Sequence, residues 1–305
     1  MIISASYKTD IPTFYGEWFL NRLRAGYCKM VNPYGGQVYR ISLAPGDVDG
    51  FVFWTKNLGP FLERLAQVRS MAFPFVVQYA INAYPRSLEL SVEDAEKSVD
   101  HMRLLAAEYG PRVAVWRYDT IVFTSDTPAG FHRRNFERLA RELEGTTDEV
   151  VVSFAQLYRK TLRNMDRAAR RFGFQWEDPP RETKIALAGE LAACARAHGM
   201  RFTVCSQRVF LGPGIEDAAC IDAARMSDVA GREIRARRKG NRPECGCFEC
   251  RDIGEYDTCP HGCVYCYAVN HRALARQRYR LHDPASEFLF PPVYSSEAPA
   301  AGAQM

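Results

Sequence analysis

Three cysteines near the C-terminal end of the chain have a spacing that suits cluster chemistry. Cys259, Cys263 and Cys266 follow the pattern C-x3-C-x2-C. A compact loop of this kind can present three thiolates to a 4Fe-4S cluster and leave the fourth iron open. An open iron can chelate the amino and carboxylate groups of S-adenosylmethionine, and an electron delivered through the cluster can then cleave the sulfonium to a 5'-deoxyadenosyl radical. The alternative is a zinc-ribbon-like site that serves only folding.

A second group of thiols precedes this loop. Four thiolates can close a second 4Fe-4S cluster for electron transfer, or they can hold a tetrahedral Zn ion that stabilises the fold, and the sequence leaves both alternatives open. Cys250 is a substitute ligand, whereas Cys28 and Cys194 lie in helical patterns and are expected to be buried, inert thiols. The candidate ligands of the second site are Cys205, Cys220, Cys245 and Cys247.

The residues next to the third cysteine of the loop add a resemblance. Tyr265 precedes Cys266 and Tyr267 follows it, and this arrangement resembles the signature of radical S-adenosylmethionine enzymes. The resemblance implies that Tyr265 lies near the adenine of the cofactor, and Tyr267 is a second candidate contact. The family favours a (β/α)6 partial barrel. Its cysteine loop normally follows the first strand, whereas here the loop follows the last predicted strand. His261, inside the loop, is expected to face solvent.

Short β-rich runs alternate with segments of helical periodicity, and these elements must position the cysteines. Six such strands predict an α/β fold with a parallel sheet, arranged as a complete or partial (β/α) barrel of about six βα units, with chemistry at the C-terminal strand ends. We expect a barrel domain over 1–211, a cysteine-rich metal-binding extension over 212–290 and a disordered tail over 291–305. The predicted strands cover residues 2–5, 51–54, 75–79, 113–118, 150–154 and 201–205.

The segment after the first predicted strand is rich in hydrogen-bonding side chains. Ser4, Ser6, Lys8 and Asp10 stand before Pro12, more polar groups than a plain βα turn requires. They are candidate contacts for the bound cofactor. The alternative is an ordinary helix entry, in which Asp10 or Thr13 is the N-cap and Pro12 lies in the first turn.

Charged groups leave two further strands at the expected mouth of the barrel. Lys56 follows the second predicted strand, and Arg117 and Asp119 lie at the end of the fourth. These three are the candidate catalytic or substrate-binding residues. Because residues two apart on a strand share a face, Arg117 and Asp119 can equally form a structural ion pair.

Four segments taken together look like a bacterial family known only as a domain of unknown function, over roughly residues 1 to 270. The resemblance implies a relation to radical S-adenosylmethionine proteins through the C-terminal cysteine loop, and it implies no settled substrate. The segments are Ile2-Ile3-Ser4-Ala5-Ser6 with Thr9-Asp10-Ile11-Pro12, Phe53-Trp54-Thr55-Lys56-Asn57, Trp116-Arg117-Tyr118-Asp119, and Asp257-Thr258-Cys259-Pro260-His261-Gly262-Cys263.

The overall charge gives little indication of a partner. The chain has 40 basic and 36 acidic residues, a formal net charge of +4, so nucleic acid is compatible but not indicated. A basic run over 232–242 predicts a solvated helix face rather than a nucleic-acid contact, or a docking site for an acidic reductant of the flavodoxin or ferredoxin type. We expect no membrane partner and a cytoplasmic location, where ten cysteines favour metal ligation over disulfides.

Three hypotheses follow for the function. The first is a radical enzyme that abstracts hydrogen from an unknown substrate. The second is a non-catalytic zinc- or iron–sulfur-binding barrel that recognises a nucleic acid or a protein. The third is a hydrolytic or DNA-repair enzyme that uses its cysteines only for folding. The metal content discriminates the first from the second.

Overall fold

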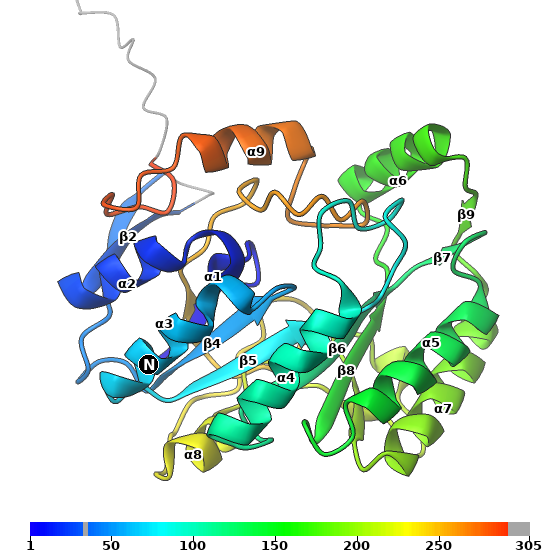
Figure 1. Ribbon diagram of the computed structural model, residues 1–305, viewed down its shortest axis with the longest axis horizontal. Helices are drawn as coiled ribbons and strands as arrows, with labels where there is room; N and C mark the ends of the chain where they lie inside the picture. The colour runs from blue at the N-terminus through cyan, green and yellow to red at the C-terminus, as the bar shows by residue number, and fades with distance from the viewer. Residues whose placement is uncertain (33–35, 292–305) are drawn as a thin grey trace, which may run out of the picture.

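The computed structural model describes residues 1–32 and 36–291, and its centre is one sheet of parallel strands (Figure 1). All six predicted strands are present in this sheet, so the α/β fold is confirmed. The strands have the order β11-β10-β8-β6-β5-β4-β1-β12, and no pairing among the described residues joins β11 to β12. The strands are β1 (Ile2–Ala5), β4 (Gly50–Thr55), β5 (Phe75–Ala80), β6 (Ala114–Ile121), β8 (Glu149–Phe154), β10 (Arg201–Val204), β11 (Glu216–Asp217) and β12 (Cys250–Asp252).

The edge strand β12 comes from the C-terminal part of the chain. It pairs in parallel with β1, with Ile2 opposite Cys250 and Ser4 opposite Asp252. The sequence did not predict this strand, because three residues are too few to show a strand periodicity. This pairing has a consequence for the topology. Because β12 and β1 are parallel neighbours, the chain that leads to the cysteine loop and the segment after β1 leave the sheet side by side, at the C-terminal ends of the two strands.

One face of the sheet packs against helices. Alternate side chains such as Ile3, Phe51 and Val77 point to this face and form the larger core. The helices cover this face in Figure 1. They are α1 (Ile11–Phe14), α2 (Gly16–Ala25), α3 (Leu62–Ser70), α4 (Ala95–Tyr109), α5 (Ala129–Glu142) and α7 (Arg181–Ala197), with a short 3-10 turn η1 (Gly59–Phe61) before α3.

The opposite face of the sheet is covered by the chain that follows β10. Ile2, Val52 and Val151 point to this face, where they pack with Ile221 and Met226 in a second core. Met226 belongs to α8 (Ala223–Ala230), and the turn η2 (Arg208–Phe210) and β11 lie in the same segment. Much of the predicted cysteine-rich extension is therefore a packed layer on the sheet.

Two helices and two small hairpins complete the described chain. α6 (Arg159–Phe172) and α9 (Arg272–Arg280) lie above the C-terminal ends of the strands (Figure 1). The hairpins are β2 (Tyr27–Val31) with β3 (Val38–Ser42), and β7 (Phe123–Thr124) with β9 (Trp176–Glu177). None of the helices in the described ranges is long and apolar enough to cross a membrane. Residues 292–305 of the predicted tail lie outside the described residues.

Candidate functional site

The loop with Cys259, Cys263 and Cys266 is fixed to the segment that follows β5. The Val264 amide donates to the Leu88 carbonyl at 3.0 Å, and the Ser91 amide donates to the His261 carbonyl at 3.0 Å. On the other side, the Tyr15 hydroxyl donates to the Thr258 carbonyl at 2.6 Å. These bonds are needed because an irregular loop cannot satisfy its own backbone groups. They hold the loop at the C-terminal edge of the sheet.

The three cysteines of this loop are free thiols, each of intermediate exposure. Burial raises the pKa of Cys259 and of Cys263, and the charge of Lys56 acts in the opposite direction on Cys263. The three sulfurs influence one another electrostatically, but no hydrogen bond joins them within the described residues. The loop therefore presents separate thiols to a common region.

His261 is buried, so the expectation that it faces solvent is wrong. Its side chain is 3% exposed, and its Nε2 lies 2.8 Å from the Asp10 Oδ2. Its Nδ1 lies 3.1 Å from the Ser91 carbonyl, and its ring packs edge-on against Phe14 at 4.7 Å. The expectation rested on the neighbouring residues Pro260 and Gly262, which are typical of an exposed turn. The residues that bury His261 come from elements distant in sequence, so the local pattern gave no sign of them.

Asp10 has several roles at once. Its Oδ1 accepts from the Thr13 amide at 2.9 Å and caps α1, as the helix-entry alternative predicts. Its Oδ2 accepts from the Lys56 amide at 2.8 Å and contacts His261. Asp10 thus connects the end of β4, the start of α1 and the cysteine loop. A direct contact between Asp10 and a cofactor stays a prediction.

The other polar residues after β1 converge on a carboxylate that the sequence analysis missed. Asp252, at the end of β12, accepts from the Ser4 hydroxyl at 2.8 Å and from the Ser6 hydroxyl at 2.9 Å. The Lys8 ammonium lies 3.5 Å from the same carboxylate. Burial raises the pKa of Asp252. The only sequence signal for this residue is its position shortly before the cysteine loop.

Lys56 belongs to a buried polar network that reaches the cysteine loop. Its ammonium lies 2.7 Å from the Glu89 Oε1, which also accepts from the Tyr265 hydroxyl. The Asn82 amide donates to the Tyr265 hydroxyl at 3.0 Å and to Glu89 at 3.2 Å. Sequence reasoning missed Glu89 and Asn82, which lie in a loop without periodicity. Tyr267 is more exposed, and its hydroxyl donates to the Tyr7 carbonyl at 2.5 Å.

Arg117 and Asp119 form the ion pair that their spacing allows. The Arg117 Nη2 lies 2.6 Å from the Asp119 Oδ2, and the side chains are 6% and 22% exposed respectively. The Arg117 Nη1 also donates to the Gln78 Oε1 at 3.0 Å, and its guanidinium lies 4.9 Å from the Trp54 ring centroid. A catalytic role for the pair stays a prediction.

Arg117 also connects this pair to the second thiol set, defined as Cys205, Cys220, Cys245 and Cys247. The Cys220 sulfur lies 3.6 Å from the Cys205 sulfur and accepts from Arg117 at 3.0 Å. The Cys247 thiol contacts both Cys220 and Cys245, and its hydrogen bond lowers the pKa of Cys245 to about 6. The fold thus gathers four thiols from three separated segments. Cys250 is not among these contacts.

The contacts above do not amount to a preformed ion site. Among the described residues, no three or more His, Cys, Asp or Glu side chains are arranged as the ligands of a single metal ion. The second thiol set forms a chain of contacts, whereas no hydrogen bond joins the sulfurs of the cysteine loop in the described residues. A metal at either set would therefore require the cysteine side chains to rearrange.

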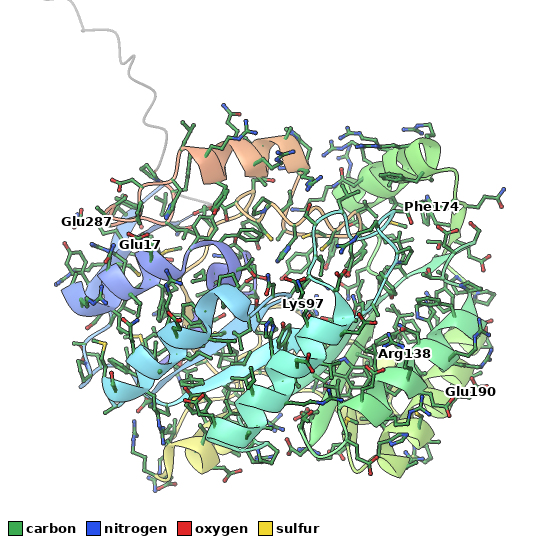
Figure 2. The ribbon with its side chains drawn as sticks, in the orientation of Figure 1. Glu17, Lys97, Arg138, Phe174, Glu190 and Glu287 are labelled. Atoms are coloured by element: carbon green, nitrogen blue, oxygen red, sulfur yellow. The ribbon has the colours of Figure 1, made fainter. Side chains whose placement is uncertain are left out.

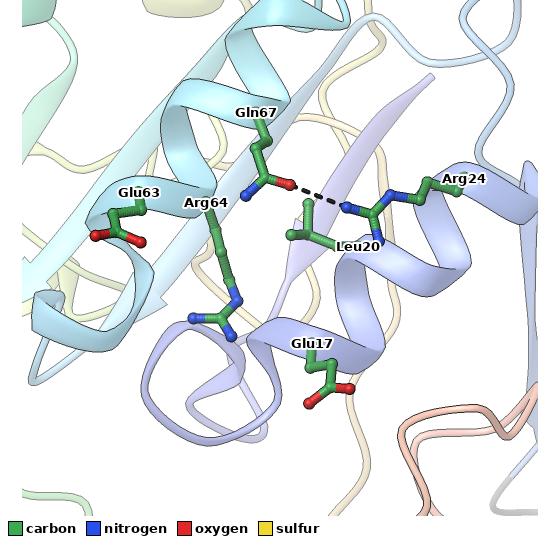
Figure 3. Close-up of a pocket in the computed structure, with 6 residues that line it drawn as sticks. All are labelled: Glu17, Leu20, Arg24, Glu63, Arg64 and Gln67. Carbon is green, nitrogen blue, oxygen red and sulfur yellow. Dashed lines mark hydrogen bonds between the residues drawn. The ribbon is translucent and has the colours of Figure 1, made fainter.

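A surface hollow between α2 and α3 contains none of the predicted site residues. The Arg24 guanidinium donates to the Gln67 Oε1 across it at 3.0 Å (Figure 3). It therefore gives no support to any of the predicted roles. The hollow is lined by Glu17, Leu20, Arg24, Glu63, Arg64 and Gln67.

The fold and these sites define an α/β protein with a cysteine loop at the C-terminal edge of a parallel sheet. A family model described as "Domain of unknown function (DUF1848)" matches residues 2–268, and the chain belongs to that family. Comparison with curated proteins and with solved structures finds no match.

Proposed function

We propose that this protein is a radical S-adenosylmethionine enzyme in which Cys259, Cys263 and Cys266 hold a 4Fe-4S cluster. One observation supports the proposal most directly: three free thiols with C-x3-C-x2-C spacing lie at the C-terminal edge of a parallel sheet. Active sites of (β/α) folds gather at this edge. The sheet corresponds in this proposal to a partial (β/α) barrel.

The three thiols of the loop, which make no hydrogen bonds to one another in the described structure, are compatible with a cluster. Each cysteine of a cubane binds a different iron, so the sulfurs stand farther apart than the ligands of one ion. The three sulfurs interact electrostatically without hydrogen bonds to one another. Lys56 supplies a positive charge next to Cys263, and its ion-pair partner Glu89 acts on Cys263 in the opposite direction.

The position of β12 accounts for the unusual place of the loop in the chain. In the family that the motif resembles, the loop follows the first strand. Here the loop follows β12, which pairs with β1 at the end of the sheet. The loop therefore emerges from an edge strand beside β1, although it comes late in the sequence. This arrangement supports the proposal that the loop binds a cluster beside the first strand, as in the family that the motif resembles.

When bound, the cluster with S-adenosylmethionine supplies a 5'-deoxyadenosyl radical that abstracts hydrogen from the substrate. Tyr265 is the proposed neighbour of the adenine, and its hydroxyl is oriented by Glu89 and Asn82. Asp119 is the more exposed member of its ion pair, so it is the group that would orient a substrate. The reductant in this proposal is an acidic protein of the flavodoxin or ferredoxin type.

The second thiol set favours a different metal. Four sulfurs around one Zn ion at about 2.3 Å lie about 3.8 Å from one another. The Cys205 and Cys220 sulfurs are 3.6 Å apart, near that separation. On this one distance we propose a single tetrahedral ion of the zinc type for this set rather than a second cluster, and the other thiols would have to turn toward a common centre to bind it. Taken alone, such a site would support the alternative function, a non-catalytic metal-binding protein.

Metal analysis tests the proposal. The protein is purified without oxygen, its iron, sulfide and zinc are measured per chain, and the electron paramagnetic resonance of the dithionite-reduced sample is recorded with and without S-adenosylmethionine. We expect about four irons and a signal that shifts with S-adenosylmethionine. Zinc without iron or sulfide, also after attempted reconstitution, would contradict a radical mechanism and leave a zinc-stabilised fold.

A further inference from the structure

The helices α6 and α9 concentrate positive charge that the overall composition conceals. Asp166 is the only acidic residue on either helix. Most of the basic side chains are exposed to solvent. Figure 2 shows nitrogen-bearing side chains along both helices. The ten basic residues of this α6–α9 surface are Arg159, Lys160, Arg163, Arg167, Arg170, Arg171, Arg272, Arg276, Arg278 and Arg280.

These charges differ from those of the basic run over 232–242. That run is not helical, so the expectation of a helix face is wrong. Nearby carboxylates also neutralise much of its charge. Arg235 pairs with Glu233, and both Arg237 and Lys239 pair with Glu249. In the described part of the chain, none of the ten residues of the α6–α9 surface forms an ion pair with a carboxylate. Their charge remains available to a partner.

The two helices share one surface next to the cysteine loop. Burial lowers the pKa of Arg272, and the nearby charges of Arg276 and Arg171 lower it further, so the two helices are within electrostatic reach of each other. The Asn164 amide of α6 donates to the Val269 carbonyl at 3.3 Å, and Arg278 of α9 donates to the Tyr256 carbonyl at 2.8 Å. Figure 1 shows the loop running between α6 and α9.

Exposed aromatic rings lie among the charges. Tyr158 and Phe172, at the two ends of α6, are 44% and 39% exposed, and Tyr279 of α9 is 41% exposed. The Arg171 guanidinium lies 4.9 Å from the Phe172 ring centroid, so an arginine already stacks at this position. A small hollow beneath α6, with room for about one water, is lined by Thr161, Met165 and Tyr265 among others. The surface therefore combines cations and exposed rings beside the cysteine loop.

We propose that the α6–α9 surface binds single-stranded nucleic acid. Unpaired arginines bind phosphodiesters, and exposed rings stack on unpaired bases, which is the combination that single-strand binders use. An acidic protein would pair with the arginines but would have no need of exposed rings between them. This binding stands independently of the cluster, and it would place a nucleotide beside the cysteine loop.

Fluorescence anisotropy tests this with fluorescein-labelled mixed-sequence 20-mers of DNA and of RNA, each between about 50 and 200 mM salt. The full chain is used, and the two probes show which sugar is preferred. We expect saturable binding that weakens as salt rises. In the variant R163Q/R167Q/R170Q, the affinity at the lowest salt should fall about tenfold or more, and the slope of log K against log salt should decrease by about 2.

A matched variant separates this surface from the net charge. R235Q/R237Q/K239Q removes an equal number of positive charges from the basic run over 232–242, whose charges are neutralised by carboxylates, and should change the affinity by less than about twofold. F172A should weaken binding about fivefold or more through lost stacking, whereas L104A, which truncates an exposed side chain on α4, should leave it unchanged. Circular dichroism verifies that each variant is folded.

Three results would overturn the proposal. The first is the absence of saturable binding by either probe. The second is an equal loss of affinity in the two triple variants, which would reduce binding to net charge. The third is charge-dependent binding of an acidic flavodoxin by a chain that does not bind the oligonucleotides, which would assign the surface to an electron donor. None of these depends on whether the cysteine loop holds iron.

Discussion

The two cysteine sets of this protein are assembled in different ways. Cys259, Cys263 and Cys266 lie on one short loop, and their sulfurs make no hydrogen bonds to one another in the described structure. The second thiol set comes from three separated segments, and its sulfurs are in contact, at 3.6 Å for Cys205 and Cys220. The first set is defined by sequence spacing and the second by the fold. Loss of a ligand should therefore affect cofactor content in the first set and folding in the second.

The environments of the two sets differ as well. The loop lies at the C-terminal edge of the sheet beside Lys56 and Glu89, within a polar network. The second set belongs to the packed core that covers one face of the sheet, where Cys220 and Cys247 are 3% and 4% exposed. A site that must admit a substrate needs polar surroundings such as those of the cysteine loop. A structural ion fits buried surroundings such as those of the second thiol set.

The largest effect is expected from Cys263→Ala. Loss of one thiolate should reduce the iron content from about four per chain to less than one and abolish S-adenosylmethionine cleavage, because three ligands are the minimum for this cluster. Iron and sulfide analysis measures this. The control is Cys194→Ala, which removes a thiol of α7 that belongs to neither set. Full iron in the Cys263 variant would show that the loop is not the cluster site.

Cys220→Ser should act on stability. We expect loss of the zinc and a decrease in the free energy of unfolding of about 3 kcal/mol or more, because metal binding contributes directly to folding. The iron on the other set should remain. Urea unfolding with parallel metal analysis tests both statements. A variant that loses iron and keeps zinc would reverse the assignment of the two sets.

Asp252→Asn tests how the cysteine loop depends on its edge strand. The change weakens the acceptor of Ser4 and Ser6 and removes the charge that faces Lys8. We expect a destabilisation of about 2–3 kcal/mol in urea. Asp100→Asn removes an exposed pair with Arg103 and should cost less than about 1 kcal/mol. Equal effects would mean that Asp252 does not anchor this edge.

The smallest of these effects is expected from His261→Ala. It removes the contacts to Asp10 and to the Ser91 carbonyl, and we expect a loss of about 1–2 kcal/mol. His198→Ala, which removes an exposed pair with Glu144, should change stability by less than about 1 kcal/mol in the same thermal or urea assay. An unchanged His261 variant would indicate that the cysteines alone position the loop.

Sequence reasoning predicted the elements that carry a periodic signal. The six inner strands show as short apolar, β-rich runs and the segments between them show helical periodicity, and all six strands lie in the sheet. The edge strands β11 and β12 have two and three residues, and no pattern can define elements so short. The same limit hid Asp252, whose role depends on β12 pairing with β1.

The polar contacts of the site were less accessible to sequence reasoning. Arg117 and Asp119 are two residues apart on one strand, so their pairing follows from strand geometry. Glu89 and Asn82 meet Tyr265 only through tertiary structure, across more than 170 residues of chain. The charge of the α6–α9 surface was missed for another reason: a balanced total of 40 basic and 36 acidic residues says nothing of their distribution.

The pairing of β12 with β1 has a consequence for the order of folding. Residue 2 meets residue 250 in this ladder, so the contact spans nearly the whole chain and its loop closure is entropically costly. During synthesis β1 can pair with β4 long before β12 leaves the ribosome. Until then, one edge of β1 has unpaired backbone groups that can recruit another strand. The cysteine loop is thus among the last parts to assemble, and in the proposed function the cluster would be inserted after translation.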